Sequence, residues 1–559
     1  MRRTILSSMF GLLLLCCAGI SWGDNPDREL KRSVGIDRTT WIDHDEQPIT
    51  QPPEWESNYY TGMFRQAITD PLSHAFDIPD KLLIIPRSLG AKTEREAVNV
   101  NAFDEVPNSS WFTNRNHLKA IPPNELRKGP TEVVLPKKPW TIKHAKAGGQ
   151  TAGFQIKDAD GKKWLIKLDP AGYPQLVSGA DMVSRTLFWA AGYNVPNNQP
   201  VRFRREDLKI DEDLLKGNED GEQMRESDLA AVLERGARFP DSSYSALASL
   251  FIPGEVLGAP SMQKRRPGDA NDWYTHNHRR ELRGMYVLAS WLNSWDAKDQ
   301  NFLDVFVPTT KDSLGHVDHY VLDVGASLGA AGMGAREPWH GYENTIDWGW
   351  MARRLVTLGF TVEPWRHAHG DPGIPAVGNF ESAAYRPEQF KTLQEQPAFR
   401  AMSDRDGYWG AKIVASFSRD QIAAAIDAGG YEDPKAKQYL LKTLMERREK
   451  VMRYWFREVA PLDFFEIKDG RLKFHDLAQD VGITGPREYL VQIDSEGKDD
   501  DKSGAYRLKS PELPLDNITS DATHLELHLS IAGSKAKPVK VELSRTAGAD
   551  WVVTWIRHG

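Results

Sequence analysis

Short runs in which apolar and polar residues alternate occupy two parts of the chain, and a helical period occupies much of the sequence between them. Alternation is typical of strands, whereas apolar residues at steps of three and four are typical of helices. The first alternating part begins near Trp140 and contains glycine- and aspartate-rich segments of the kind that join strands in hairpins. There we predict strands at 140–143, 154–157, 163–168, 201–204 and 246–253.

An amphipathic helix interrupts these strands and is expected to end at Gly192, because glycine is favoured after helix C-termini. The following segment, 206–241, is strongly charged and is interpreted as an insertion with one short helix at 228–236. The apolar face of the amphipathic helix comprises Leu176, Ala180, Val183, Leu187 and Ala190.

A second apolar stripe predicts another helix that starts after His276 and ends near Ser294. We expect a loop at 295–301 after this helix, and then two strands that are joined by a polar turn. The strands are expected at 302–307 and 317–324.

Downstream of residue 325 the pattern is mostly helical to about residue 460, most clearly at 422–428 and 436–455. Alternation returns after Pro461, which predicts a small terminal β-sandwich. Its strands are expected at 489–494, 524–531, 539–543 and 551–556.

Residues 24–138 lack a sustained period and are interpreted as an irregular N-terminal arm. Within it, 99–130 is dense in turn formers and aromatic residues, which predicts a loop packed by its own Trp111 and Phe112. The domain prediction is therefore a leader at 1–23, the arm at 24–138, a β-rich part at 139–258, a helical part at 259–460 and a β-rich end at 461–559.

The first 23 residues have the layout of a secretory signal peptide, with Arg2 and Arg3 before an apolar run and small residues before a cleavage site near Gly23. The alternative is a lipoprotein acylated at Cys16 or Cys17, although neither follows the usual small residue. Both interpretations predict export, so the mature chain would be periplasmic or secreted. Cleavage would also remove every cysteine, so the folded chain would use neither disulfides nor thiol chemistry.

The composition of the chain limits the classes of partner that the protein is expected to bind. The 559 residues include 71 basic and 78 acidic side chains, and the net charge of −7 gives no reason to expect nucleic acid as a partner. The mean hydropathy of −0.53 excludes a polytopic membrane protein, so a membrane contact would be peripheral at most. An apolar content of 40% is enough for folded cores.

One segment carries a specific chemical pattern. Asp296, Lys298 and Asn301 have the Asp-x-Lys-x-x-Asn spacing of a phosphotransferase catalytic loop, and Asp323 and Gly325 form an Asp-x-Gly after a predicted strand. An aspartate accepts the proton of an attacking hydroxyl, and a lysine neutralises charge on the transferred phosphoryl group. Asparagine and a second aspartate supply the hard oxygen ligands that Mg²⁺ prefers. Asp296 and Lys298 are therefore candidate catalytic residues, and Asn301 and Asp323 are candidate metal ligands.

The upstream strands fit the same chemistry. Lys167 lies near the end of a predicted strand, in the sequence Trp-Leu-Ile-Lys, and Asp181 follows early in the next helix. Gly148, Gly149 and Gly153 form a glycine-rich turn whose backbone is suited to covering phosphates. We therefore predict that these five residues bind a nucleotide cofactor.

In the order of these motifs, residues 140–460 resemble the protein-kinase-like fold in its atypical branches. These branches include the phosphoinositide kinases, the HipA-type toxins and the secreted spore-coat kinases. The resemblance implies an α+β fold with a two-lobed core, a β-rich N-lobe and a helical C-lobe, and ATP with Mg²⁺ or Mn²⁺ as cofactor. It also implies that Lys167 binds the α- and β-phosphates beside Asp181, that Asp296 is the base and that Lys298 contacts the γ-phosphate.

The chain is also similar to a family of exported bacterial proteins through two stretches, 104–115 and 278–284. This kinship implies nothing about activity.

The sequence departs from the kinase pattern in three ways. No His-Arg pair precedes Asp296, the helix acid is Asp181 instead of the longer glutamate, and the glycine turn lacks the regular Gly-x-Gly-x-x-Gly. Each departure is compatible with a catalytically inactive fold. The same residues also have simpler structural interpretations. Lys167 could be an exposed lysine on an edge strand, Asp181 and Arg185 could form a surface salt bridge, and a charged segment further along the chain could be the solvated start of a helix. That helix start comprises Arg279, Arg280, Glu281 and Arg283, which are alternatively suited to steering an anionic substrate.

Histidines offer a different chemistry. His276 and His278, together with His316, Asp318 and His319, are candidate zinc ligands. A weaker candidate is the pair His367 and His369.

The leading hypothesis is an exported kinase-like protein that transfers a phosphoryl or nucleotidyl group from ATP–Mg to a hydroxyl on an envelope protein, lipid or glycan. Export argues against it, because an exported enzyme meets little ATP. The alternatives are a catalytically inactive, pseudokinase-like envelope scaffold and a zinc-dependent envelope enzyme.

Overall fold

The computed structural model describes a mixed α+β fold with sheet-rich and helical regions. The described residues are 43–55, 64, 96–130, 133–145, 150–216, 223–309, 313–360, 363–366, 372–494, 504–515, 522–545 and 550–559. The helices are α7 (Pro123–Lys128), α8 (Leu176–Ala191), α9 (Glu212–Lys216), α10 (Glu226–Glu234), α11 (Arg280–Leu292), α12 (Trp348–Val356), α13 (Pro397–Arg400), α14 (Asp404–Ala415), α15 (Arg419–Ala428), α16 (Pro434–Glu458) and α17 (Leu477–Asp480).

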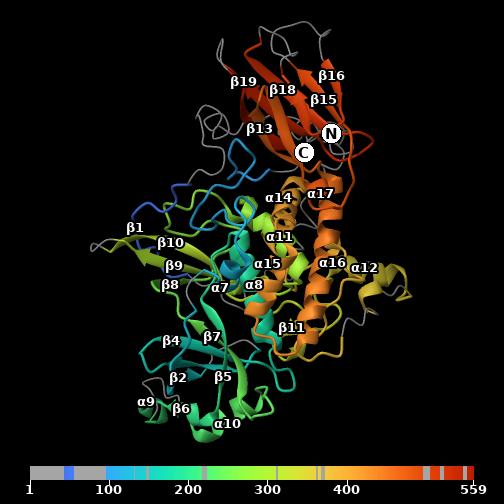
Figure 1. Cartoon of the computed structure of the whole chain (residues 1–559). Helices are drawn as coiled ribbons and strands as arrows, with labels where there is room; N and C mark the ends of the chain where they lie inside the picture. Colours follow the sequence, from blue (N-terminus) through green and yellow to red (C-terminus); the bar gives the residue numbers. More distant parts are fainter. Residues whose placement is uncertain are drawn as a thin grey trace, which may run out of the picture.

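A six-stranded sheet forms the first β-rich region, which lies at the lower end of the molecule in Figure 1. Its order is β5-β7-β4-β3-β2-β6, and only the pair β2–β6 is parallel. The predicted strands are confirmed, and the charged segment adds α9 and β6 to the expected helix α10. The strands are β2 (Trp140–Ala145), β3 (Gly153–Lys157), β4 (Lys163–Leu168), β5 (Asn198–Phe203), β6 (Leu208–Ile210) and β7 (Tyr244–Leu250).

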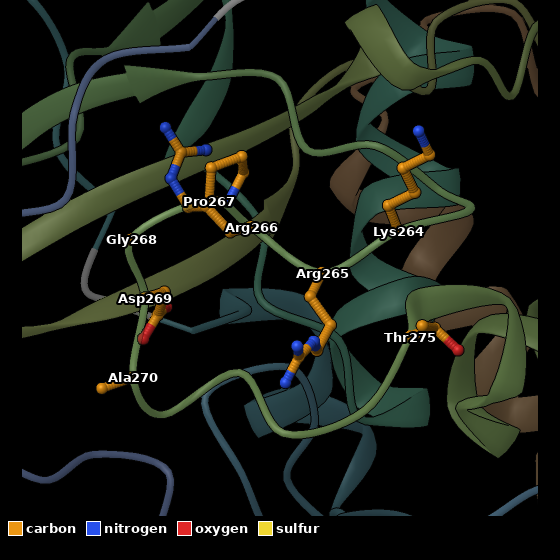
Figure 2. A pocket seen from close by; sticks show the side chains of 8 residues that line it. All are labelled: Lys264, Arg265, Arg266, Pro267, Gly268, Asp269, Ala270 and Thr275. Atoms are coloured by element: carbon orange, nitrogen blue, oxygen red, sulfur yellow. The ribbon is translucent and has the colours of Figure 1, made fainter.

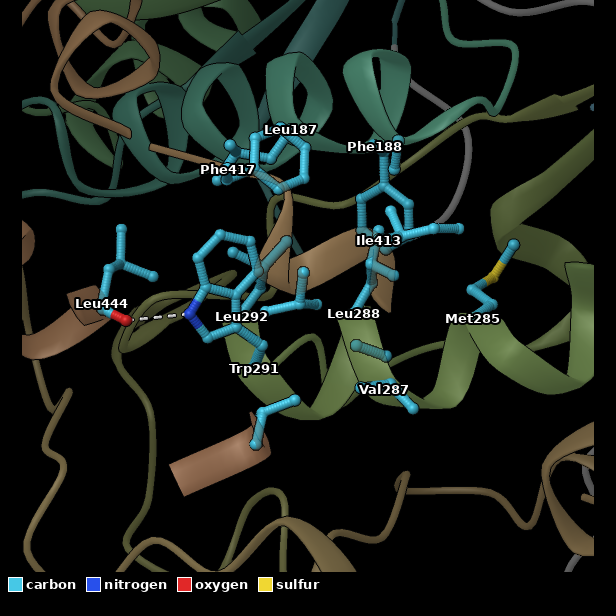
Figure 3. Packing of buried hydrophobic residues seen from close by; sticks show 14 of the residues in the cluster. Leu187, Phe188, Met285, Val287, Leu288, Trp291, Leu292, Ile413, Phe417 and Leu444 are labelled. Carbon is cyan, nitrogen blue, oxygen red and sulfur yellow. Dashed lines mark hydrogen bonds between the residues drawn. The ribbon is translucent and has the colours of Figure 1, made fainter. Parts of the chain in front are cut away.

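The helices α8, α11, α14, α15 and α16 lie between the two β-rich regions and share the largest apolar core. Trp291 of α11 is fully buried there, and its indole nitrogen donates a hydrogen bond to the carbonyl oxygen of Leu444, 2.9 Å away (Figure 3). Gly410 permits a close crossing of α11 and α14, because a Cβ there would lie 2.6 Å from the carbonyl oxygen of Gly284. The amphipathic helix α8 ends before Gly192, as predicted.

A four-stranded antiparallel sheet follows α11 in the chain and has the order β1-β10-β9-β8. The strands predicted at 302–307 and 317–324 are confirmed as β9 and β10. The sheet consists of β1 (Ile49–Thr50), β8 (Glu255–Gly258), β9 (Phe302–Pro308) and β10 (Leu314–Val321), and a two-stranded hairpin of β11 (Ala330–Ala331) and β12 (Gly334–Ala335) follows it in the chain.

The C-terminal strands form a three-stranded and a five-stranded sheet that share one apolar core. The strands at 489–494 and 524–531 have the bounds that alternation predicts. Four further strands were missed: β13 (Leu462–Lys468), β14 (Arg471–Asp476), β16 (Gly504–Leu508) and β17 (Glu512–Pro514). The others are β15 (Tyr489–Asp494), β18 (His524–Ile531), β19 (Val539–Ser544) and β20 (Val552–His558).

The charged start of α11 is buried, so the prediction of a solvated or substrate-steering helix start is wrong. Arg280 donates to the Asp104 carboxylate at 2.6 Å and to the Asp406 carboxylate at 3.1 Å. The two stretches 104–115 and 278–284 are therefore bonded to each other. We call this group the arginine cluster, and it comprises Arg280, Arg283, Arg405, Asp104, Asp406 and His558.

Two other expectations are corrected. Trp111 does not pack within its own loop: its ring stacks on His319 of β10, with centroids 3.7 Å apart. Phe112 contacts Tyr193 and Trp409 instead, because the arm lies against the helical core. The segment from 325 to 396 is mostly irregular, since α12 is the main helix of its described residues.

Some expectations fall outside the described residues. These are the signal peptide and both cysteines, Gly148, Gly149, His367 and His369. Among the described residues, no helix is long and apolar enough to cross a membrane.

Candidate functional site

Lys167 and Asp323 form the centre of the site. The Lys167 ammonium donates to the Asp323 carboxylate at 2.7 Å, although the two residues lie 156 positions apart. Lys167 lies on β4, which pairs with β3 on one side and β7 on the other, so the prediction of an edge-strand lysine is wrong. Lys167 is 8% exposed, whereas the Asp323 side chain is 39% exposed. The pair therefore joins the six-stranded sheet to the segment after β10 and keeps one side open to solvent.

Burial alone would lower the pKa of the Lys167 ammonium, because desolvation disfavours a charged form. The Asp323 and Asp181 carboxylates outweigh burial and raise this pKa above its usual value. Lys167 therefore stays charged at neutral pH.

Asp181 lies on α8 and is fully buried beside this pair. Its Oδ1 accepts a hydrogen bond from the Asn198 amide at 2.7 Å, and its Oδ2 has no hydrogen-bond partner among the described residues. Burial raises the pKa of Asp181 to about 6, and the Asp323 carboxylate adds to this effect while Lys167 opposes it. The predicted surface salt bridge to Arg185 is wrong, because Arg185 is buried and donates to the carbonyl oxygen of Pro196.

The catalytic-loop motif lies between α11 and β9. The Lys298 ammonium contacts both Asp296 carboxylate oxygens, at 2.8 and 3.0 Å. The Asn301 amide nitrogen donates to the Asp296 carbonyl oxygen at 2.5 Å and to its carboxylate at 3.2 Å. Burial raises the pKa of Asp296; Lys298 and Asn301 oppose this, and Asp323 adds to it.

Backbone hydrogen bonds join the motif to Asp323. The Asn301 carbonyl oxygen accepts from the amides of Leu322 and Asp323, at 2.9 and 3.3 Å. The Gly325 amide then donates to the Asp323 carboxylate at 3.1 Å. The structure thus brings together six predicted residues, here called the site cluster: Lys167, Asp181, Asp296, Lys298, Asn301 and Asp323.

Gly153 holds the site in a different way from the one predicted. A Cβ at this position would lie 2.1 Å from the Ile166 carbonyl oxygen, so the close pairing of β3 with β4 requires glycine. Because Ile166 precedes Lys167, this pairing fixes the strand that carries the lysine.

Asp169 was missed by the sequence analysis. It is fully buried after β4 and accepts from the amides of Val177 and Ser178 at 2.8 Å and from the hydroxyls of Ser178 and Ser245 at 2.6 Å. It thereby attaches the start of α8 to the end of β4, and so positions Asp181 relative to Lys167. An aspartate directly after a strand and a few residues before a helix was the signal for this role.

The candidate zinc ligands do not form one centre. His276 contacts the Asp272 carboxylate at 2.8 Å, and His319 contacts the Asp304 carboxylate at 2.6 Å. His316 lies on the opposite face of β10 from His319, because successive strand residues point to opposite faces and the spacing is odd.

A pocket of about 600 Å³ lies apart from the site cluster and shares no lining residue with it (Figure 2). Arg265 points into the ring that 264–275 forms, whereas Arg266 points away and donates to the Asp304 carboxylate at 2.7 Å. The pocket is lined by Lys264, Arg265, Arg266, Pro267, Gly268, Asp269, Ala270 and Thr275.

Comparisons with known proteins found no matching family model and no similar curated protein. The solved structures that are similar to this chain include three kinase structures. The Helicobacter pylori proinflammatory kinase CtkA has 10% identity and a TM-score of 0.31 over 57% of this chain and 95% of its own. The Golgi casein kinase with Mn/ADP bound has 12% identity and a TM-score of 0.25, and the match covers 57% of this chain and 74% of the kinase chain. Another structure of the Golgi casein kinase has 11% identity and a TM-score of 0.27, and the match covers 58% of this chain and 74% of the kinase chain.

At these TM-scores the likenesses carry no weight for function. What this protein does must be inferred from its own residues.

Proposed function

We propose that the protein is a phosphotransferase with a kinase-like core, formed by an N-lobe at 139–258 and a C-lobe at 259–460. The observation that carries this proposal is the 2.7 Å ion pair between Lys167 and Asp323, with Asn301 and Asp296 hydrogen-bonded beside it. These residue types meet at one point in the arrangement that phosphoryl transfer needs: a cation for phosphates, oxygen ligands for a metal and a carboxylate base.

The nucleotide side comprises Lys167, Asn301 and Asp323, and we expect the glycine-rich stretch 148–153 to contribute to phosphate binding. The Asn301 side-chain nitrogen (Nδ2) donates to Asp296, so its side-chain oxygen (Oδ1) would face a cation beside the partly exposed Asp323 carboxylate. This donor set fits Mg²⁺ or Mn²⁺, which neutralises phosphate charge when bound.

The acceptor side comprises Asp296 and Lys298. The hydroxyl proton of the acceptor passes to the Asp296 carboxylate, the hydroxyl oxygen attacks the phosphorus, and the bond from phosphorus to the leaving phosphate oxygen breaks. Lys298, 2.8 Å from Asp296, compensates negative charge at the same point. Nucleotidyl transfer needs the same groups, with attack at a different phosphorus.

The acceptor is a hydroxyl on an envelope protein, lipid or glycan, reached after export and cleavage near Gly23. We propose that the acceptor carries an anionic group that binds in the pocket at 264–275. Lys264 and Arg265 are exposed there and make no ion pair among the described residues. Arg266 bonds Asp304, three residues after Asn301 along β9, a separation of about 10 Å in a strand.

A pseudokinase-like scaffold is the second candidate, and one observation favours it. Asp181 bonds Asn198, and no ion pair within 4.0 Å connects it to Lys167 among the described residues. The lysine–acid pair of an active kinase is thus replaced by the pair of Lys167 with Asp323.

Thermal melting with nucleotide separates the candidates. We expect ATP with Mg²⁺ or Mn²⁺ to raise the melting temperature of the protein, and Asp323→Ala to abolish this shift. Asp296→Asn should keep the shift but lose transfer of labelled phosphoryl groups by about 100-fold or more. The double variant Lys264→Glu, Arg265→Glu should keep the shift and lose transfer only to anionic acceptors.

A shift without turnover in wild type and Asp296→Asn would favour the scaffold over the enzyme. The absence of a shift with every nucleotide and metal would contradict nucleotide binding altogether.

A further inference from the structure

One cluster outside the site has the composition of a metal centre. Glu46, His316 and Asp318 each present one ligand atom, and these atoms lie within 4.8 Å of one another. His316 and Asp318 lie on the same face of β10, two residues apart, on the side away from the buried Val317 and His319. Glu46 comes from the arm, 270 positions earlier than His316, and sequence spacing gave no sign of it.

The backbone brings Glu46 to this face and holds it there. The arm strand β1 pairs with β10, with Ile49 opposite Gly315, and continuation of this antiparallel register puts Glu46 opposite Asp318. The neighbouring Asp45 is buried, and its carboxylate accepts from the Ser110 hydroxyl at 2.8 Å and from the Ser110 amide at 3.0 Å.

The distances suit a shared cation better than a direct bond. The His316 Nε2 lies 3.3 Å from the Asp318 Oδ1, which is long for a charge-assisted hydrogen bond of about 2.8 Å. Two ligands bound at about 2.0–2.1 Å to one tetrahedral zinc ion are separated by about 3.3–3.4 Å. Glu46 is exposed, so its side chain is free to rotate toward a bound ion.

The charges of the three side chains also favour a bound cation. Within the described residues, no lysine or arginine forms an ion pair with Glu46 or Asp318. Besides His316, the Asp318 carboxylate accepts a 3.4 Å hydrogen bond from the Tyr320 hydroxyl and lies near His319. The Nδ1 atom of His316 is buried and has no hydrogen-bond partner in the described part of the chain. One imidazole with two carboxylates is a donor set for Zn²⁺, with Mn²⁺ as a weaker competitor.

We propose that Glu46, His316 and Asp318 bind one zinc ion that fastens the N-terminal arm to β10. The site leaves a fourth coordination position for water. None of the three residues belongs to the site cluster, and Asp323 lies beyond the end of β10, so we treat this centre as separate from the proposed phosphotransfer.

Calorimetric titration of the chelator-treated full chain with zinc chloride tests this centre. We expect one zinc per chain, no measurable binding in His316→Ala, and binding at least tenfold weaker in Glu46→Gln. His475→Ala is the matched control, because His475 is exposed and contacts a single carboxylate, that of Asp480, at 2.8 Å. It should bind zinc as wild type does.

Melting curves provide a second readout. Zinc should raise the melting temperature of wild type and of His475→Ala, but not that of His316→Ala. Because Glu46 is exposed, Glu46→Gln keeps the test valid even if His316→Ala folds poorly. No zinc binding at micromolar concentration, or binding that survives both His316→Ala and Glu46→Gln, would overturn the proposal. The ATP–Mg²⁺ shift should be unchanged in Glu46→Gln, so failure here is distinguishable from failure of the proposed function.

Discussion

The site cluster and the arginine cluster are both charged networks that join distant segments, yet they differ in how completely their charges are paired. In the arginine cluster, Asp104 is bonded to Arg280, Arg405 and His558, and all are buried. In the site cluster, Asp181 Oδ2 has no hydrogen-bond partner in the described chain, and the Asp323 side chain is 39% exposed. Each carboxylate of the arginine cluster thus has at least two cationic partners, which favours a structural role, whereas the less completely paired carboxylates of the site cluster keep capacity for a ligand.

The pKa values of Asp104 and Asp181, one carboxylate from each cluster, are shifted in opposite directions. Burial raises the pKa of Asp104, but Arg280, Arg405 and His558 outweigh burial and hold this pKa well below its usual range. For Asp181 burial prevails, and the pKa rises to about 6. A buried carboxylate that lacks enough cationic partners is typical of functional sites.

The largest effect on stability is expected in the arginine cluster. Arg280→Met should lower the free energy of unfolding by about 3–5 kcal/mol, because Asp104 and Asp406 would stay buried with fewer partners. Urea denaturation followed by tryptophan fluorescence measures this loss. Arg453→Met is the control, since Arg453 is exposed and its one ion pair among the described residues is with Glu449, and it should cost less than about 0.5 kcal/mol. Equal losses in the two variants would refute a structural role for the cluster.

The second-largest loss of stability is expected for Gly153→Ala. The added Cβ would meet the Ile166 carbonyl oxygen, so β3 and β4 must separate, at a cost of about 1–3 kcal/mol. Nucleotide binding should weaken as well, since Lys167 follows Ile166. Gly485→Ala is the matched control, because a Cβ there meets no atom within 4 Å. If the two alanine variants melted at the same temperature, the strand contact would not matter.

Lys167→Met should cost about 1 kcal/mol of stability, much less than Arg280→Met, because Asp323 remains partly solvated. Its effect on ligand binding should be the reverse: the ATP–Mg²⁺ melting shift should be lost in Lys167→Met, while a folded Arg280 variant retains it. A Lys167 variant that keeps the full shift would break the contrast between the two clusters.

Asp181 should contribute to stability in a way that is visible as pH dependence. Its pKa of about 6 in the folded state lies above the value of about 3.9 in an unfolded chain. Its stabilising contribution is therefore complete below about pH 4 and is lost as the pH rises through 6. Asp181→Asn should remove this contribution, so the melting temperature of wild type should fall more than that of the variant between pH 4.5 and 7. Parallel curves would show that Asp181 is ionised throughout.

Local patterns predicted much of the fold. Alternation in 489–494 and 524–531 gave the exact bounds of β15 and β18, because a strand with one buried face repeats every two residues. Half of the site cluster was predicted from spacing, since Asp296, Lys298 and Asn301 come from one short loop, and Lys167, Asp181 and Asp323 were assigned to the same site by the order of their motifs along the chain. Chemistry confined to a few consecutive residues leaves such a signal.

Pairing between distant residues that belong to no such motif left no signal in the sequence. Arg280 was expected in solvent because its partner Asp104 is 176 positions away. Glu46 was missed for the same reason, and Trp111 was assigned to its own loop although it stacks on His319. A run of charged residues is assigned to the protein surface unless its ion-pair partners are known. Sequence patterns therefore predict the burial of charged residues least well.

Calorimetric titration of the protein with ATP in the presence of Mn²⁺ tests the central claim most directly. We predict one nucleotide per chain, binding that depends on the divalent cation, and its loss in both Lys167→Met and Asp323→Ala. No binding at millimolar ATP, or binding that both variants retain, would contradict the assignment of the site cluster to a nucleotide.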